Sequence, residues 1–312
     1  MTHPAPGNGA TPSVADDARP EARANAMTVD VEDYFQVQAF ADRISRDAWD
    51  SIPRRVEQNV DRLLELFAGQ RASATFFCLG WIAERHPAML RRIAGAGHEI
   101  ASHGYDHTRV HELTAAQFRD DIRRTKAVLE DAGGKPVLGY RAPTFSIGPR
   151  TPWAYDILAA EGHRYSSSVY PIRHDLYGAA DAPRMPFPVA SGRLWEIPLT
   201  TRRLWGQNFP CAGGGYFRLL PYWLSRQNLR RVNAANAPPG IFYMHPWEID
   251  AEQPVVPGIG LKTRFRHYTN LKAMPLRLQR LLCDFRWGRM DQVFGGLGLG
   301  LDPSAATAAA AE

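Results

Sequence analysis

The chain has 312 residues, of which 45% are hydrophobic and 22% charged, and this suits one large α/β domain with a sizeable core. The formal net charge is +5, but the basic residues are scattered or form short pairs. We therefore expect them mainly on solvated helix faces, with a groove for an acidic polymer as the alternative, and no stretch matches a nucleic-acid-binding module.

Both ends of the chain have the composition of segments outside a folded core. Residues 1–26 are rich in Ala, Pro, Gly, Asn and Asp and lack the apolar run of a secretory signal, so they predict a disordered leader. Residues 291–312 include an Ala-rich run and predict a flexible tail. No apolar run approaches the roughly 20 residues that span a bilayer. We therefore expect a soluble, cytoplasmic protein without a transmembrane segment.

Strand-like and helix-like segments alternate between these ends. In chain order the sequence predicts a strand at 26–31, a helix at 56–67, a strand at 74–79, a helix at 81–94, strands at 98–102 and 137–140 with a helix from 114 to 129 between them, a helix at 153–160, strands at 164–169 and 194–199, a helix at 220–234, a strand at 241–244 and a helix at 276–285. Repeated βα alternation of this kind predicts a parallel sheet or barrel in a single domain.

Two local signals sharpen this outline. Thr114-Ala-Ala-Gln117 fits a capping box at the start of a helix, and Gly133-Gly134 would end that helix. The cysteines Cys78, Cys211 and Cys283 are far apart and form no CxxC pair, which argues against a disulfide framework or a Cys-type zinc site. We expect each cysteine to be a small buried hydrophobic residue.

An acidic motif, Thr28-Val-Asp-Val-Glu-Asp33, ends the first predicted strand. Because side chains alternate along a strand, Asp30 and Glu32 should point the same way. Two convergent carboxylates at a strand end suit a metal ligand beside a general base. A polar strand end or a helix N-cap would have the same sequence.

A histidine pair follows the third predicted strand. The His-x3-His spacing of His103 and His107 brings two imidazoles together on a helix face or across a tight loop, and imidazole is a good ligand for zinc. His107 and His111 repeat the spacing, so spacing alone does not choose between the pairs. His103 directly follows a strand, which favours the first pair.

Two later strands also end in polar residues. Arg141 follows the strand 137–140 and could hold a carboxylate through two hydrogen bonds, or it could be a surface arginine in a turn. His245 follows the strand 241–244 and could act as a general acid, because histidine titrates near neutrality, or it could be a buried core histidine. In a βα barrel the carboxyl ends of the strands share one mouth, so the four motifs should meet there.

The order of these motifs resembles the polysaccharide deacetylase family, also called the NodB-homology or carbohydrate esterase 4 type. That family has an acidic first motif, a His-x3-His second motif, an Arg-x-Pro third motif and a late histidine, and the likeness runs from about Met27 to Glu248. A subgroup found in exopolysaccharide gene clusters beside exosortase systems is more closely similar, and it also has a C-terminal extension. The likeness to that subgroup is carried by residues 29–35, 141–146, 213–221 and 245–248, with 267–287 in the extension.

The resemblance implies a distorted (β/α) barrel of about seven strands over residues 27–290, with the extension from about residue 250. It implies a metal-dependent hydrolase that removes N-acetyl groups from the amino sugars of an exopolysaccharide or its precursor. The expected metal is zinc, with cobalt or nickel as alternatives, and the expected partner is an N-acetylated poly- or oligosaccharide. A cytoplasmic site of action, peripheral to the exopolysaccharide assembly machinery, fits this reading.

The resemblance also implies a role for each matched residue. Asp30 stands at the position of the catalytic base, and Arg141 at the position of the arginine that orients it. His245 stands at the position of the general acid. His103 and His107 stand at the positions of the two metal-binding histidines.

One position departs from the family pattern. The family has two adjacent aspartates in its first motif, the second being a metal ligand, whereas Val31 follows Asp30 here. Strand parity favours Glu32 as the third metal ligand, and Asp33 is the alternative.

Aromatic and loop residues near these motifs are candidates for substrate binding. We expect Pro143, Phe145, Tyr216 and Trp247 to contact the sugar, and Trp205 and Phe217 are further aromatic candidates, although core packing would account for about half of the aromatic residues. The glycines 213–215 would let a loop approach the substrate closely, or would form a simple flexible turn. Two other functions remain open: an amidase of the same fold acting on a small cyclic amide, and an inactive glycan-binding homologue.

Overall fold

The computed structural model describes residues 23–175, 177–234 and 237–301. The predicted leader up to residue 22 and the end of the predicted tail, residues 302–312, lie outside the described residues. The first strand, β1 (Asn25–Val31), begins one residue earlier than expected. The tail predicted from residue 291 is wrong for 291–301, because Phe294 and Leu301 are buried and pack into a hydrophobic cluster.

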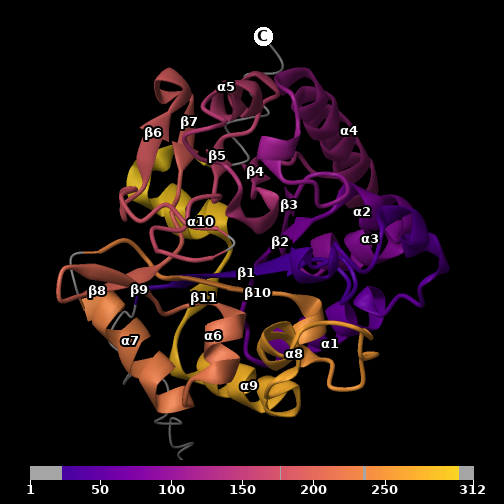
Figure 1. The fold of residues 1–312 in the computed structure, drawn as a ribbon. Coiled ribbons are helices and arrows are strands. Elements are labelled where there is room, and N and C mark those ends of the chain that lie inside the picture. Colours follow the sequence, from indigo (N-terminus) through magenta and orange to yellow (C-terminus); the bar gives the residue numbers. More distant parts are fainter. Residues whose placement is uncertain (1–22, 176, 235–236, 302–312) are drawn as a thin grey trace, which may run out of the picture.

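A curved sheet runs through the middle of the molecule (Figure 1). Its parallel part has the order β10-β1-β2-β3-β4-β5-β7, and these are the seven strands that the sequence predicts. Besides β1 they are β2 (Thr75–Cys78), β3 (Glu99–Ser102), β4 (Gly139–Tyr140), β5 (Tyr165–Ser166), β7 (Leu194–Glu196) and β10 (Ile241–Met244).

The sequence analysis missed four short strands. β6 (Phe187–Val189) pairs antiparallel with β7, and β11 (Trp287–Gly288) pairs parallel with the start of β1. β8 (Thr201–Leu204) and β9 (Gln207–Pro210) form a separate hairpin. Within the described residues no strand pairing joins β10 to β6, so the sheet curls without closing. The predicted distorted barrel is confirmed.

Helices surround the sheet, with α2, α3 and α4 on the right of Figure 1 and α6 to α9 below. The predicted helices correspond to α1 (Val56–Gly69), α2 (Gly80–Arg85), α3 (Pro87–Gly95), α4 (Ala115–Gly133), α5 (Trp153–Ala160), α7 (Tyr222–Ala234) and α9 (Met274–Asp284). The helix expected over 81–94 is two helices, because Pro87 has no N–H to continue α2 and starts α3 instead. The helices that the sequence analysis missed are α6 (Gly214–Leu219), α8 (Leu261–Tyr268) and α10 (Met290–Phe294).

The local signals in α4 are confirmed. The Thr114 side chain accepts a hydrogen bond from the Gln117 N–H, and the Gln117 side chain accepts one from the Thr114 N–H, so the capping box is complete. Gly134 ends the helix with φ +66°, a left-handed conformation that glycine adopts without strain. Sequence therefore determines both ends of this helix.

Two of the three cysteines are buried as expected, and the third is not. Cys78 and Cys211 are buried, and burial raises the pKa of the Cys211 thiol to about 12. Cys283 is exposed, so the prediction that it is a buried hydrophobe is wrong. It lies on α9 beside the buried stripe of Leu278, Leu281 and Leu282, one position past the face that packs on the core.

Within the described ranges, no helix has both the length and the hydropathy needed to cross a bilayer.

A half-buried carboxyl joins the sheet to the C-terminal segment. Glu99, at the start of β3, accepts hydrogen bonds from the hydroxyls of Thr75 at 2.5 Å and Tyr165 at 2.8 Å. It also accepts one from the Asp291 N–H at 3.2 Å. Burial, followed by the nearby Asp291 carboxylate, raises the pKa of Glu99 to about 8.

The folded chain therefore keeps a proton on Glu99 that the unfolded chain releases above its ordinary pKa of 4.5. As the pH rises from about 5 to about 8, wild type should lose about 2 kcal/mol of unfolding free energy relative to Glu99→Gln. The loss stays this small because solvent screens part of the charge on the half-buried carboxyl. Urea unfolding at both pH values measures the difference. The Arg92 guanidinium lowers the pKa of Glu57, so that carboxyl stays ionised throughout this pH range. The control variant Glu57→Gln should therefore lose as much unfolding free energy between pH 5 and pH 8 as wild type. A Glu99→Gln effect of equal size at both pH values would contradict the prediction.

Candidate functional site

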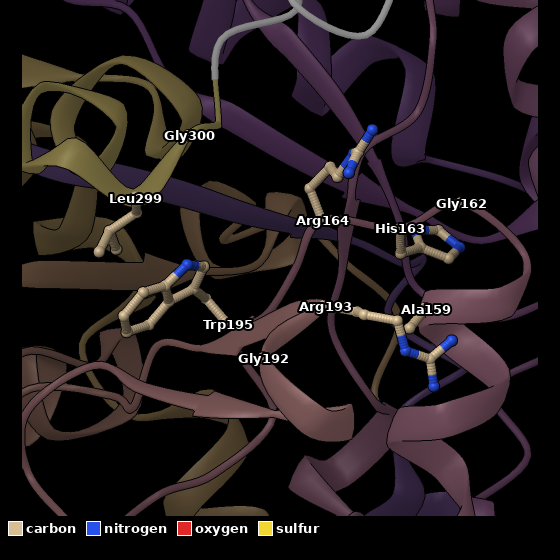
Figure 2. A pocket seen from close by; sticks show the side chains of 9 residues that line it. All are labelled: Ala159, Gly162, His163, Arg164, Gly192, Arg193, Trp195, Leu299 and Gly300. Carbon is tan, nitrogen blue, oxygen red and sulfur yellow. The ribbon is translucent and has the colours of Figure 1, made fainter. Parts of the chain in front are cut away.

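Two cavities lie at opposite ends of the strands. The larger, of about 800 Å³, opens at the carboxyl ends and is lined by residues from all four sequence motifs. The smaller, of about 340 Å³, opens where Arg164 precedes β5 and Arg193 precedes β7, at the amino ends (Figure 2). It contains none of the predicted site residues, so the larger cavity is the candidate site.

Glu32, His103 and His107 converge in the wall of this cavity. One potential ligand atom from each lies within 4.8 Å of the other two. The Nε2 atoms of His103 and His107 are 3.9 and 3.5 Å from Glu32 Oε1. All three residues are at most 5% exposed. Two imidazoles and one carboxylate at this separation can hold a divalent metal ion.

The protonation of His103 suits metal binding. Its Nδ1 donates to the Arg141 carbonyl at 2.8 Å, which leaves the Nε2 lone pair directed at the cluster. Burial lowers the pKa of His103 to about 4, so the ring is neutral at physiological pH.

His107 reaches the cluster from a strained backbone. Its φ is +61°, a left-handed conformation that residues with a side chain rarely adopt. Thr144 and Phe145, which also line the cavity, share this property with φ values of +54° and +49°. Strained backbone of this kind concentrates at functional sites, where the surrounding structure compensates for its cost.

The donor set also leaves one acceptor without a partner. Glu32 Oε2 is buried and makes no hydrogen bond with the described residues. Burial opposes ionisation of Glu32, but the imidazoles of His107 and His245 outweigh it and hold its pKa well below the usual range. A buried, ionised carboxylate with an unsatisfied oxygen beside two imidazoles fits a divalent cation.

The alternatives to this set are directed elsewhere. Asp33 accepts hydrogen bonds from the backbone N–H groups of Tyr34 at 2.8 Å, Arg55 at 2.7 Å and Val56 at 3.0 Å, and so fixes the start of α1. His111 lies in a short 3-10 helix and is not part of the cluster. The structure thus brings Glu32 together with His103 and His107.

Asp30 and Arg141 form a buried pair beside the cluster. Arg141 Nη1 donates to Asp30 Oδ1 at 2.6 Å and to Thr28 Oγ1 at 2.8 Å, and the guanidinium lies 4.1 Å from the centre of the Phe77 ring. Arg141 is fully buried and Asp30 is 2% exposed. The pair is held by one hydrogen bond, where the sequence suggested two.

Residues that the sequence analysis missed hold Arg141 in place. The Ser167 carbonyl and hydroxyl accept from its guanidinium at 3.1 and 3.2 Å. Glu196, at the end of β7, accepts from the N–H groups of Ser168 and Val169 at 2.8 and 2.9 Å and fixes this turn. A charged residue inside the predicted strand 194–199 was the only sequence signal for Glu196.

His245 lies between two glutamates. Its Nε2 is 3.2 Å from Glu32 Oε1, and its Nδ1 is 3.8 Å from Glu248 Oε2. Burial opposes protonation of His245, but Glu32 and then Glu248 outweigh it and raise its pKa to about 10. Its ring also stacks on Trp247 at 5.1 Å and 19°. The site therefore holds a proton on an imidazole that reaches the cavity.

Glu248 is itself anchored by a buried arginine that the sequence analysis missed. Arg218 Nε lies 3.2 Å from Glu248 Oε1, and both side chains are 1% exposed. The same guanidinium donates to the carbonyls of Arg266, His267 and Thr269, which end α8. This pair therefore ties α6 and α8 to the end of β10.

The predicted substrate-binding residues separate into two groups. Phe145 and Tyr216 line the cavity, as does Trp247, which is only 6% exposed because it also stacks on His267 at 4.1 Å. Pro143 is buried and does not line the cavity, because it packs beside Gly104. Its predicted contact with substrate is therefore not supported.

The other aromatic candidates lie elsewhere. Trp205 is 91% exposed in the turn between β8 and β9, and Phe217 is buried in the core. Tyr177 and Tyr243, which the sequence analysis missed, complete an aromatic wall of the cavity. The ring centres of both lie 5.3 Å from the ring centre of Phe145, and the Tyr243 ring centre lies 6.2 Å from that of His245. Tyr177 lies in a loop without a motif, so no local pattern indicated it.

The glycines 213–215 allow close packing and do not form a loose turn. A Cβ on Gly214 would lie 1.8 Å from Glu248 Oε2, whereas a Cβ on Gly215 would meet nothing within 4 Å.

Gly214→Ala should lower the unfolding free energy by about 2 kcal/mol, since it displaces the buried Arg218–Glu248 pair. Gly215→Ala in the same helix is the control and should be neutral or stabilising. Thermal unfolding of both variants measures this, and equal stability would contradict it.

Comparison with known proteins finds matches to two parts of the chain. Residues 47–163 match the polysaccharide deacetylase family. Residues 167–295 match a domain of unknown function, DUF3473. His103, His107 and Arg141 lie in the first part, and His245, Glu248 and α8 lie in the second. The candidate site is therefore built from both.

Individual relatives agree with this assignment. The chain is 32% identical over 126 residues to a peptidoglycan deacetylase of Helicobacter pylori, a match that covers 39% of this chain and 42% of the relative. It is 33% identical over 73 residues to a peptidoglycan-N-acetylglucosamine deacetylase of Bacillus cereus, covering 23% of this chain and 26% of the relative. The chain thus spans less than half of each of these relatives.

A solved structure shares the fold. A protein of Mycobacterium smegmatis, assigned provisionally to the polysaccharide deacetylases, matches with a TM-score of 0.59 and 22% identity. The match covers 91% of this chain and 93% of that one.

Proposed function

Because the chain carries a polysaccharide deacetylase domain, we propose that it is a metal-dependent hydrolase that removes N-acetyl groups from the amino sugars of a polysaccharide. The observation that carries this proposal is the buried cluster of Glu32, His103 and His107, which lines the same cavity as the Asp30–Arg141 pair and His245.

Glu32, His103 and His107 would hold the metal. Two imidazoles and one carboxylate suit zinc best, with cobalt and nickel as alternatives. A bound divalent ion supplies Lewis acidity and lowers the pKa of a water molecule to near neutrality. The neutral state of His103 and the ionised state of Glu32 prepare the site for that ion.

Asp30 would act as the general base. The Arg141 hydrogen bond holds one of its oxygens, so the carboxylate faces the cavity in a fixed orientation. It removes a proton from the attacking water as the water oxygen bonds to the acetyl carbon. Arg141 touches no reacting atom and serves to position Asp30.

His245 would act as the general acid. Glu32 and Glu248 favour its protonated form, and its side chain is 20% exposed. It donates its proton to the amide nitrogen as the C–N bond breaks, and the products are acetate and a free amino sugar. No covalent intermediate on the protein is needed.

The cavity suits a glycan more than a compact ligand. Its volume of about 800 Å³ and its aromatic wall can hold a sugar residue, because aromatic rings pack well on sugar faces. We propose an N-acetylated exopolysaccharide or its precursor as the substrate, processed on the cytoplasmic side beside the assembly machinery. Phe145, Tyr177 and Tyr216 would contact the sugar.

Acetate release from a panel of N-acetylated oligosaccharides tests the proposal. Chelated protein should be inactive, and addition of zinc, cobalt or nickel should restore activity. A cyclic imide in the same assay separates a small-ring amidase, and glycan binding without turnover in metal-loaded protein would indicate a non-catalytic homologue. Absence of acetate release with every metal and glycan would refute the proposal.

A further inference from the structure

The outer face of α8 carries large apolar side chains that no other part of the described chain covers. Leu261 is 85% exposed and Phe265 is 60% exposed. Their spacing of four places them side by side on one helix face. Val255, 50% exposed, lies in the preceding loop, which the Tyr268 hydroxyl ties to α8 through the Val256 N–H at 3.0 Å. We name these residues, 255 and 261–266, the α8 surface.

Basic side chains flank the apolar ones. Lys262, Arg264 and Arg266 are all exposed, and α8 contains no acidic residue. Asp175 pairs with Lys262 at 2.6 Å and with Arg266 at 3.1 Å. Three cations against one carboxylate leave the α8 surface positively charged.

The α8 surface borders the mouth of the candidate site. Lys262, Thr263 and Arg266 line the large cavity from one side of α8. Figure 1 shows α8 in the lower part of the molecule, where it packs beside α6. Whatever contacts the outer face of α8 therefore meets the opening through which a substrate enters.

We propose that the α8 surface binds an anionic lipid membrane. A helix face with Leu and Phe in the middle and Lys or Arg on both sides is the pattern of a helix lying in the headgroup region of a bilayer. Because α8 has only eight residues, the attachment is weak and reversible.

This docking would turn the cavity mouth toward the lipid headgroups. A glycan still attached to its lipid carrier would then enter the site directly from the membrane. That consequence rests on the proposed deacetylase function, whereas membrane binding itself does not.

Co-sedimentation of the full chain with vesicles tests the proposal. The protein should bind phosphatidylcholine vesicles that contain phosphatidylglycerol at least ten-fold more tightly than phosphatidylcholine alone, and added salt should weaken the binding. The Leu261→Ala, Phe265→Ala double variant should lose about ten-fold in affinity. Arg264→Glu should also weaken binding, and more strongly at low salt than at high salt.

A matched double variant guards against a general effect of surface hydrophobicity. Trp223→Ala with Leu276→Ala removes an aromatic and a leucine that are 67% and 55% exposed on α7 and α9, and it should bind vesicles like wild type. Circular dichroism checks that all variants are folded. Failure to sediment with anionic vesicles, equal binding to both vesicle types, or equal loss in the control variant would overturn the proposal. The assay measures no acetate release, so its failure is separate from failure of the proposed function.

Discussion

Glu32→Gln is expected to lower the affinity for zinc at least 100-fold, whereas Asp33→Asn should leave it close to that of wild type. Glu32 shares the buried cluster with the two imidazoles, and a neutral amide is a far weaker ligand than a carboxylate. Asp33 instead accepts three backbone N–H groups at the start of α1. Calorimetric titration of chelated protein with zinc gives both affinities.

Without metal, Asp33→Asn should lower the unfolding free energy more than Glu32→Gln does. Asp33→Asn weakens the hydrogen bonds that fix the start of α1 and should cost about 1 to 2 kcal/mol. Glu32→Gln removes a buried charge with an unsatisfied oxygen, so its cost should be smaller. Zinc binding that survives Glu32→Gln and fails in Asp33→Asn would show that the third ligand is assigned wrongly.

Asp30→Asn is expected to lower kcat for acetate release by about 10³-fold while zinc binding stays near that of wild type. The amide cannot take a proton from water, so the general-base contribution is lost. Its oxygen can still accept the Arg141 hydrogen bond, which keeps the side chain in place. The fully buried Arg141 loses its counter-charge, so the variant should also be less stable by about 3 kcal/mol.

Steady-state kinetics well below the unfolding temperature separates these two effects. Arg141→Lys is the matched control, since it keeps the positive charge but not the contacts of the guanidinium with Ser167. It should lose about 10- to 100-fold in kcat, less than Asp30→Asn. An Asp30→Asn variant that keeps a tenth or more of the wild-type kcat would exclude Asp30 as the base.

Features encoded within single segments could be predicted from sequence. The seven parallel strands follow from short apolar runs, and the ends of α4 follow from Thr114, Gln117 and Gly134. Strand parity placed Asp30 and Glu32 on one side, and both line the same cavity. These features depend on side-chain alternation, helix periodicity and capping, which act between residues close in the chain.

The parts that failed or were missed depend on residues far apart in the chain. Glu248 gains its partner from Arg218 on α6, and Tyr177 reaches the aromatic wall from a loop without a regular pattern. Pro143 belongs to the Arg-x-Pro motif, yet it is not among the residues that line the cavity.

Sequence by itself determined the α/β barrel and the set of polar residues gathered at one end of its strands. Only the tertiary structure decided that Glu32 and not Asp33 joins His103 and His107. Both carboxylates follow the same strand, and the choice depends on the N–H groups of Arg55 and Val56, which α1 brings to Asp33. A side chain takes the partner that the fold presents to it, and local spacing does not specify that partner.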